Sequence, residues 1–414
     1  MAVNLIRNSR VFFTTNVDSA GNVRAGTGYK ASANPFTTAD TFEIQVLEGL
    51  TFTQNTTADT VTLNETGDSP NRGQRSFNVA LDPVDFSFST YVRPYKKSGG
   101  TGGTYPDGGN VTCEERFLWN AFASKDAIAA PVSDIVGTDT GTSATAWYEN
   151  TSKARLGFNK SNKNQLQAFG LIIVFGNSAY VIDNCAMDSA TIDFGIDQIA
   201  AIQWAGKGTR IRPVAITATA PNNGVVTLDG ADLDTGTDEA RAKNTTARYI
   251  TNKLSVLKLD DTIAGTTSDY KFAITGGSIT MSNNINYITP ANLGQVNIPI
   301  TYYTGTRSVT GTFNAYLKTG TGTTDKTSGQ LLEDLLASSS TDVEPSFSIT
   351  FDMGGTSDTY VTVFVPAAVV QIPTVNTEQV ISTTINFTGQ GYDNNGFNIE
   401  VDNELEVTYH CVAV

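Results

Sequence analysis

The side chains best suited to chemistry in this chain of 414 residues are few and stand far apart. His410 is the only histidine, and Cys411 follows it directly. Such a pair can supply a base and a nucleophile, or two metal ligands. No third group suited to either task lies near the pair in the sequence, so we interpret it as part of a terminal strand or arm.

Acidic residues in the middle of the chain have some of the spacing of a calcium-binding loop. They are Asp229, Asp232 and Asp234, interspersed with glycine. If an EF-hand is counted from Asp232, however, its closing glutamate falls on Lys243, which has the opposite charge. We therefore interpret this segment as a solvated linker and predict no metal site.

Two glycine-rich segments do not match nucleotide-binding loops. Residues 206–209 read Gly-Lys-Gly-Thr, but Ala201 stands where a phosphate-binding loop needs its first glycine. The segment 98–109 lacks the spacing of a dinucleotide-binding loop and is predicted to be flexible. The three tryptophans are assigned to packing. The sequence thus predicts no catalytic group and no cofactor, and therefore no enzyme.

The composition favours strands joined by turns. Thr, Ser, Asn and Gly are abundant, and only 16% of the residues are charged. The net charge of −14 argues against a surface that grips nucleic acid, because phosphate binding needs clustered Lys and Arg. Three scattered cysteines predict reduced thiols in a protein made in the cytosol. With no signal segment and no apolar run near ~20 residues, no membrane contact is expected.

The elements that must position any site occur twice, in the same order. Each copy has two short strands, a polar loop, a strand pair ending in tyrosine, one helix, and strands that end in aromatic-x-Gly-x-Gly. The matching segments are Phe42 with Phe272, 49–55 with 277–283, Tyr91 with Tyr316, 117–124 with 331–338, and 204–208 with 387–391. Such a duplication indicates symmetric assembly before it indicates chemistry.

We therefore predict a mainly β fold of two tandem domains, each with one short helix. The first domain covers residues 1–220 and the second 243–414, joined by the acidic linker 221–242. The first helix is expected to begin near Thr112, with Glu114 and Glu115 in its first turn. The polar segment 130–164 is predicted to be an elaborated surface loop.

Three runs of residues carry a resemblance to a known family. They are 72–94, which reads from Arg-Gly-Gln-Arg to Val-Arg-Pro, 190–206, and 277–312 in the second copy. Together they resemble the tail tube (major tail) proteins of long-tailed bacteriophages, of the type with a duplicated domain. The resemblance covers nearly the whole chain except 130–164 and the linker.

The resemblance implies both the fold and a structural function. Each of the two tandem domains is expected to be a β-sandwich with two antiparallel sheets and one short flanking helix. In that family, inner sheets of neighbouring subunits join into one β-barrel around a lumen, and rings stack into a tube. Duplicated members are expected to form trimeric rings with pseudo-sixfold symmetry. The lumen would hold the tape measure protein during assembly and conduct genomic DNA during ejection; a sheath protein outside the tube is left open. The protein would be made in the host cytoplasm and reside in the virion, in the phage tail.

The resemblance also implies candidate ring-bridging loops. The first is the polar loop between residues 55 and 75, and the second is its shorter counterpart, 284–295. Phe77, Val79 and Leu81 alternate after the first loop and predict a strand with one apolar face. The loop candidates are Asn55, Gly67, Asp68, Asn71 and Arg72 in the first copy, and Asn284 and Asn292 in the second.

A lumen that passes DNA is expected to carry acidic and small polar residues, because fixed cations would hold the phosphates. Along residues 191–197, Ile192, Phe194 and Ile196 share one face of a strand and are predicted to enter the core. The opposite face carries the lumen candidates, which are Thr191, Asp193 and Asp197, with Glu378 as the counterpart in the second copy.

A second function class stays open from the residues alone. A two-domain β-sandwich can also be a carbohydrate-binding or adhesin-like module of a fibre or secreted protein. Such a module is expected to show clustered exposed aromatic residues or a secretion signal, and neither is found in the sequence. Tubes or stacked rings of the purified protein would support the first function, and glycan-binding monomers the second.

Overall fold

A computed structural model describes most of the chain, and the described residues contain two α-helices and are 61% strand. The described residues are 9–25, 36, 40–62, 74–98, 108–125, 147–149, 151–156, 165–176, 178–218, 226–228, 231–233, 249–261, 269–272, 274–293, 296–320, 325–338, 346–357, 359–377, 380–391 and 404–411. The mainly β prediction is confirmed. Within the described residues, no helix is both long enough and apolar enough to cross a bilayer.

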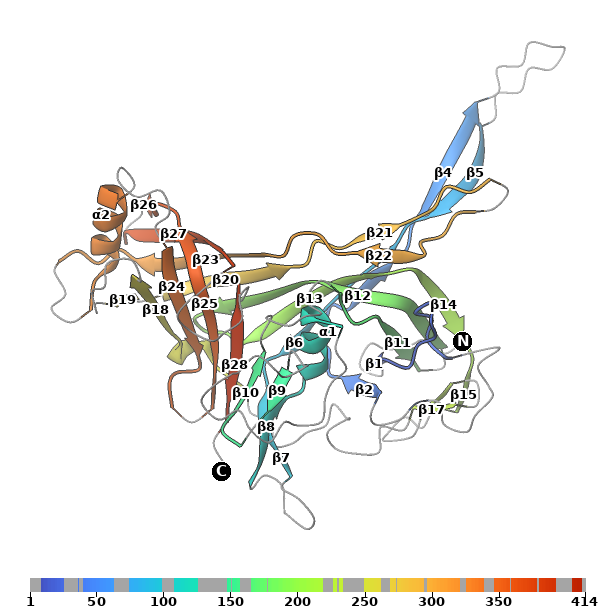
Figure 1. Ribbon diagram of the computed structural model, residues 1–414, viewed down its shortest axis with the longest axis horizontal. Coiled ribbons are helices and arrows are strands. Elements are labelled where there is room, and N and C mark those ends of the chain that lie inside the picture. Colours follow the sequence, from blue (N-terminus) through green and yellow to red (C-terminus); the bar gives the residue numbers. More distant parts are fainter. Residues whose placement is uncertain are drawn as a thin grey trace.

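The elements follow one another along the chain in two series (Figure 1). The first series is β1 (Ser9–Thr14), β2 (Thr41–Ile44), β3 (Thr51–Thr53), β4 (Thr56–Thr62), β5 (Gln74–Leu81), β6 (Val84–Tyr91), β7 (Pro94–Ser98), β8 (Gly108–Cys113), α1 (Arg116–Ala123), β9 (Trp147–Glu149), β10 (Lys153–Leu156), β11 (Phe169–Phe175), β12 (Ser178–Gly195), β13 (Ala201–Gly208), β14 (Arg210–Val214), β15 (Ile216–Ala218), β16 (Val226–Leu228) and β17 (Ala231–Leu233). The second is the 3-10 turn η2 (Asn252–Leu254), β18 (Val256–Asp261), β19 (Tyr270–Phe272), β20 (Ile274–Ser282), β21 (Asn286–Ile288), β22 (Thr301–Tyr303), β23 (Ser308–Tyr316), α2 (Ser328–Ser338), β24 (Ser346–Met353), β25 (Tyr360–Val370), β26 (Thr374–Asn376), β27 (Ser382–Gly389) and β28 (Glu406–His410).

The strand pairing of the first series recurs in the second. In the first, β1 pairs with β2 and β11, β11 with β12, β12 with β13 and β14, β13 with β6, and β6 with β3. In the second, β18 pairs with β19 and β24, β24 with β25, β25 with β27 and β28, β27 with β23, and β23 with β20. All of these pairs are antiparallel, so the duplication seen in the sequence extends to the connectivity of the strands.

The long strand β12 joins the two series. Its first part, residues 179–183, pairs with β14. Its last part pairs with β13 over residues 186–193 and with β20 over residues 189–195. The change of partners falls at Asn184, which has a positive φ of 47°. Asparagine tolerates that conformation better than most residues. One strand thereby belongs to two sheets and links the first series to the second.

A second junction between the two series lies at the last strand. The last strand, β28, pairs with β25 of its own series and also with β10 of the first. Because β10 in turn pairs with β9, two strands of the first series extend a sheet of the second. The two series are therefore joined by strand pairing at two places, β12 with β20 and β10 with β28.

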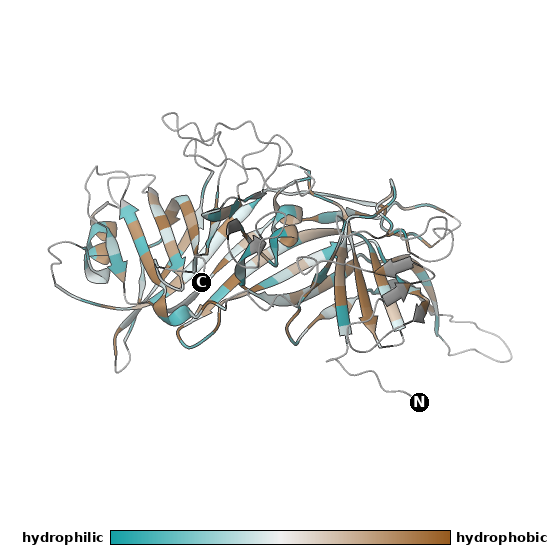
Figure 2. Ribbon diagram, turned by 90° about the horizontal axis from the view of Figure 1, so that it is seen from below, coloured by the Kyte–Doolittle hydropathy of each residue, from teal (hydrophilic) through white to brown (hydrophobic). Residues whose placement is uncertain are grey.

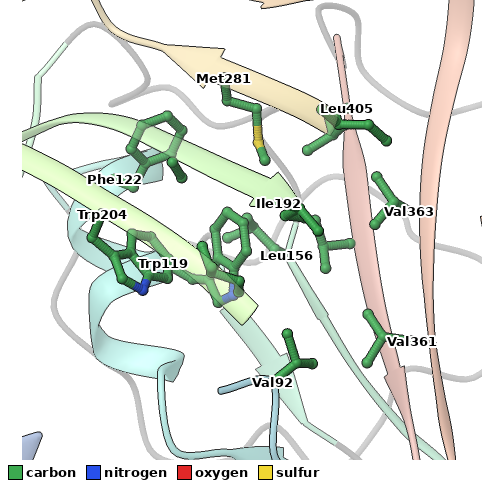
Figure 3. Close-up of a cluster of buried hydrophobic side chains, with 14 of the residues drawn as sticks. Val92, Trp119, Phe122, Leu156, Ile192, Trp204, Met281, Val361, Val363 and Leu405 are labelled. Carbon is green, nitrogen blue, oxygen red and sulfur yellow. The ribbon is translucent and has the colours of Figure 1, made fainter. Parts of the chain in front are cut away.

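One hydrophobic core spans both series. Figure 3 shows Trp119 and Trp204 of the first series in the same cluster as Met281, Val361 and Leu405 of the second. The two indole rings meet edge to face, with centroids 4.8 Å apart. Independent domains each have a core of their own. The division into domains at residues 1–220 and 243–414 is therefore a prediction that the structure does not confirm.

Three local predictions differ from the structure. The first helix begins at Arg116, and Thr112 lies in β8, so Glu114 and Glu115 precede the helix. Part of the expected surface loop 130–164 forms β9 and β10, because apolar residues such as Leu156 are buried in the core. Inside the expected linker 221–242, β16 and β17 form a small sheet with β15.

The small sheet packs on the molecule rather than standing in solvent. Leu228 and Leu233 are buried in a second apolar cluster together with Phe12 and Val181. Asp232 pairs within this sheet, while Asp229 and Asp234, the rest of the considered calcium loop, lie outside the described residues. In the sequence, Leu228 and Leu233 are five residues apart among acidic and glycine residues. This pattern is too weak to predict strands.

Candidate functional site: a polar sheet face and a projecting arm

One face of the sheet that runs through β6, β13, β12, β20, β23 and β27 is polar over its whole width. We call this surface the polar face. It consists of Ser87, Ser89, Gln203, Ala205, Ser189, Thr191, Asp193, Ser278, Thr280, Ser282, Ser308, Thr310, Thr312, Asn314, Thr384, Asn386 and Thr388. Residues opposite one another in antiparallel strands share a face, so the pairing places all of these on one side.

The polar face follows from strict alternation along each strand. In β12 the buried Ile192 and Phe194 alternate with Thr191 and the exposed Asp193. The intervening residues of the neighbouring strands, such as Trp204, are buried in the core. Figure 2 shows the same pattern, with apolar residues in brown alternating with paler and teal ones along the strands. Side chains alternate with period two, which keeps one side apolar and the other polar.

Short hydroxyl and amide side chains are linked across the polar face. The Thr191 and Thr280 hydroxyls lie 3.1 Å apart, on strands of different series. The Thr312 hydroxyl donates to Oδ1 of Asn386 over 3.0 Å. Such cross-strand pairs hold the register and use up hydrogen-bonding groups that a ligand would otherwise engage.

The polar face carries little charge. The Asp85 carboxylate and the Lys207 ammonium lie opposite each other at its edge, 3.8 Å apart, and partly neutralise one another. Asp193 is exposed and contributes a negative charge. Small neutral groups with a slight excess of negative charge give a surface that holds neither phosphates nor apolar molecules strongly.

The structure brings together some of the lumen candidates. Thr191 and Asp193 both lie on the polar face. Asp197 is exposed in the turn after β12, and Glu378 lies outside the described residues. The prediction that Ile196 enters the core is wrong: its side chain is 48% exposed, because β12 ends at Gly195 and the chain turns back there.

The predicted ring-bridging segments form a projecting arm. We define the arm as the hairpin β4–β5 together with residues 285–303, which include the hairpin β21–β22. The two parts lie side by side in Figure 1 and are joined where Asn297 N donates to Val79 O over 3.1 Å and Leu81 N donates to Asn297 O over 2.8 Å. The described residues of the first candidate loop, 55–62 and 74–75, thus belong mostly to the strands of a hairpin, and residues 63–73 lie outside the described residues.

The loop candidates lie at the base and along the sides of this arm. The carbonyl of Asn55 accepts a hydrogen bond from Asp82 N where the hairpin begins. Asn284 has a φ of 50° at the turn into the second part, and Asn292 N donates to Asn297 Oδ1. The remaining candidates, Gly67, Asp68, Asn71 and Arg72, lie outside the described residues.

The arm carries exposed apolar side chains that the sequence did not suggest. Phe77 and Val79, which were predicted to lie on one apolar face of a strand, are 55% and 43% exposed. The strands β4 and β5 project away from the sheets, so neither face of their hairpin is buried. The other exposed apolar or aromatic residues of the arm are Val61, Ile288, Leu293, Val296, Ile298, Ile300 and Tyr303. Their alternation at 296, 298 and 300 was the available signal.

A buried acidic cluster lies where β28 meets α1. The Tyr409 hydroxyl donates to Glu115 Oε1 over 2.7 Å and accepts from Trp119 Nε1 over 2.7 Å. Burial raises the pKa of Glu115 to about 7, although the hydrogen bond from Tyr409 opposes the shift. Burial likewise raises the pKa of Glu114 to about 7, against the opposing charge of Arg93. The cluster joins α1 and the residues before it to β28, and Glu115 and Tyr409 are buried in it.

The residues considered for catalysis, His410 and Cys411, make packing contacts. His410 stacks on Tyr360 with ring centroids 4.2 Å apart, and Cys411 is buried next to the Thr359 hydroxyl. The three cysteines are free thiols, as predicted. Within the described part of the chain, no three or more His, Cys, Asp or Glu side chains cluster as metal ligands would. The tryptophans pack in the core, as expected.

Comparison with known proteins agrees with the resemblance drawn from the sequence. No protein-family model matches the chain. The chain is 29% identical over 399 residues to the tail tube protein pb6 of Escherichia phage T5, a match that covers 94% of this chain and 72% of that protein. The predicted likeness to phage tail tube proteins is confirmed by this match.

Proposed function

We propose that this chain, a homologue of a phage tail tube protein, is the structural subunit of a tail tube and resides in the virion tail. It would polymerise as stacked rings around a lumen, without enzymatic activity. The observation that carries the proposal is the polar face, which continues unbroken from strands of the first series into strands of the second across the β12–β20 junction. A sheet with one polar and one buried face is the wall that such a tube needs.

The junction within the chain suggests how rings close. Among the described strands, β3 pairs with β6 alone and β26 with β27 alone, so each lies at an edge of the sheet. By the repeated connectivity, β3 corresponds to β20, and the end of β25 with β26 corresponds to the end of β12. The pairing β12–β20 inside one chain therefore has a counterpart between chains, β26 with β3 of the next. Closing the ring in this way removes both exposed edges.

Three chains would complete a ring. Each chain contributes two copies of one unit, so a pseudo-sixfold ring needs three of them. The expected mass of a detergent-free ring is three times 44.1 kDa. Native mass spectrometry of purified rings and the symmetry of a helical reconstruction both measure this. Six chains per ring would contradict the proposal.

The polar face would line the lumen, with Thr191 and Asp193 facing the DNA. Its weak charge suits a conduit, because DNA slides past small neutral groups and a few carboxylates without losing its counterions. The lumen would be occupied by the tape measure protein during assembly and by genomic DNA during ejection. A sheath outside the tube depends on whether the tail contracts, and a neighbouring gene resembling a sheath protein would decide that.

The arm would bridge one ring to the next. It leaves the sheet at one end only and exposes apolar side chains, as expected for a surface that is covered in an assembly. The decisive experiment for the whole proposal is negative-stain microscopy of the purified protein. Tubes or stacked rings support it, whereas monomers that bind glycans would favour the adhesin-like alternative and refute it.

A further inference from the structure

The strands of the polar face define two rims. The arm begins at one of them, where β6 starts at Val84, β20 ends at Ser282 and β23 starts at Ser308. The same three strands reach the other rim at Tyr91, Ile274 and Tyr316, respectively. We call these the arm rim and the opposite rim. The antiparallel pairing keeps each set of strand ends together.

The opposite rim carries two apolar patches, one for each series. The first-series patch consists of Ile196, Ile199, Tyr249 and Leu254. The second-series patch consists of Tyr316, Val380 and Ile381. Their exposed fractions lie between 40% and 65%. Isolated exposed apolar residues are ordinary, but clusters at matching ends of β13 and β27 indicate a contact surface.

Short contacts hold each patch together. Asn252 N donates to Gln198 O over 3.0 Å, which ties η2 and Leu254 to the turn that carries Ile196. Tyr249 meets Tyr91 edge to face at 5.4 Å. In the second patch, Leu317 N donates to Ile381 O over 3.0 Å. The patches are therefore fixed parts of the sheet end.

The arm needs a partner of this kind. Its hairpin β4–β5 is solvated on both faces, and a two-stranded hairpin alone is marginally stable. Phe77 and Val79 lie on one face of it, and Val61 shares that face because it pairs opposite Arg75. Leu293, in the second part, is fully exposed. Each chain thus carries two apolar hairpins at one rim and two apolar patches at the other.

We propose that the opposite rim is the docking surface for the arm of a second copy of this chain, with one hairpin on each patch. The inference rests on the proposed tube function and names the residues that receive the arm. Because donor and acceptor surfaces differ and lie at opposite ends, the contact is heterologous and does not close on itself. It adds rings without limit, which is how a tube lengthens.

The first test uses two acidic substitutions in the patches, Leu254→Asp together with Val380→Asp. Leu336→Asp, at an exposed leucine of α2 that belongs to neither patch, is the matched control. We expect the rim variant to form rings of wild-type mass while its tube fraction falls about tenfold or more, and the control to form tubes normally. Sedimentation velocity and negative-stain microscopy measure both species.

Two results of this test are decisive. Tubes from the rim variant at the wild-type level would overturn the docking surface and leave the tube function standing. If the wild-type protein forms neither rings nor tubes, the proposed function as a tail tube subunit is itself refuted. If the rim variant also loses its rings or its thermal unfolding transition, the substitutions have damaged the fold or the ring. The cross-linking experiment then decides whether the arm docks on the opposite rim.

Cross-linking tests the contact without charge changes. Protein carrying Phe77→Cys is mixed with protein carrying Leu254→Cys or Val380→Cys, and tubes are treated with a short bis-maleimide. The native Cys113, Cys185 and Cys411 are buried and do not compete. We expect mixed dimers only between arm and rim cysteines. Cross-links between two arm cysteines, or none in tubes, would overturn the proposal.

Discussion

Replacing Glu115 by glutamine should stabilise the subunit at neutral and alkaline pH. Glu115 is 2% exposed, and the Tyr409 hydroxyl donates to its Oε1. Its Oε2 has no hydrogen-bond partner among the described residues. A glutamine carbonyl keeps the bond from Tyr409 and places no charge in the core. The substitution therefore removes the cost of a buried charge and keeps the contact with β28.

The magnitude follows from linkage. The pKa of Glu115 rises from 4.5 to about 7 on folding, mainly because burial disfavours the charged carboxylate. Between these values the folded chain holds more protons than the unfolded chain, so stability falls as the pH rises. At 1.36 kcal/mol per pKa unit, the shift at Glu115 lowers the free energy of unfolding of the wild type by roughly 3 kcal/mol at pH 8. Below pH ~4.5 this loss vanishes, because the carboxyl is then protonated in both the folded and the unfolded chain. The pKa of Glu114 is raised in the same way, so Glu114 adds a similar loss of stability with rising pH, and the Glu115→Gln variant retains it.

Urea unfolding of the unassembled subunit between pH 5 and pH 8 measures the effect. The wild type should lose stability over this range, and Glu115→Gln should lose about half as much, with a higher midpoint at pH 8. Glu333→Gln, on the exposed face of α2, serves as the control and should follow the wild type. A variant whose stability falls with pH as steeply as that of the wild type would refute the reasoning.

Three further predictions concern the polar face, the arm and the sheet. Asp193→Lys with Asp197→Lys should leave rings intact but slow DNA ejection in a salt-dependent way, measured on assembled phage; normal rates would exclude a lumenal role. Replacing residues 57–80 by an Asn-Gly turn should leave a folded, ring-forming subunit that makes no tubes; tubes seen by microscopy would contradict this. Gly311→Ala should cost about 1–3 kcal/mol in urea unfolding, since a Cβ there would lie 2.3 Å from the Phe387 ring; an unchanged midpoint would exclude the clash.

The sequence was sufficient to predict the repeated elements. Strict alternation in residues 191–194 placed Thr191 and Asp193 opposite Ile192 and Phe194, as the structure has them. The aromatic-x-Gly-x-Gly ends marked β13 and β27 because a glycine there leaves room for a ring: a Cβ on Gly206 would meet Phe86. Local periodicity carries such information because it depends only on which side of a strand is buried.

What the sequence could not show depends on contacts distant along the chain. Nothing local indicates that β28 pairs with β10, or that Leu156 is buried by residues of the second series. Phe77 and Val79 alternate like core residues, and only the projection of β4–β5 away from the sheets exposes them. An apolar face covered by a second molecule has the same pattern as one covered by the chain itself.

The position of β28 has a consequence for the order of synthesis. The indole of Trp119 donates to the hydroxyl of Tyr409, which leaves the ribosome 290 residues later. Until then, β10 has no partner on the side that β28 will occupy, and α1 lacks part of its cover. A chain released early thus keeps an open core and an unpaired edge, as aggregation-prone intermediates do. Only complete chains should reach the growing tail, and a chain ending before Glu406 should be degraded by proteases that spare the full-length subunit.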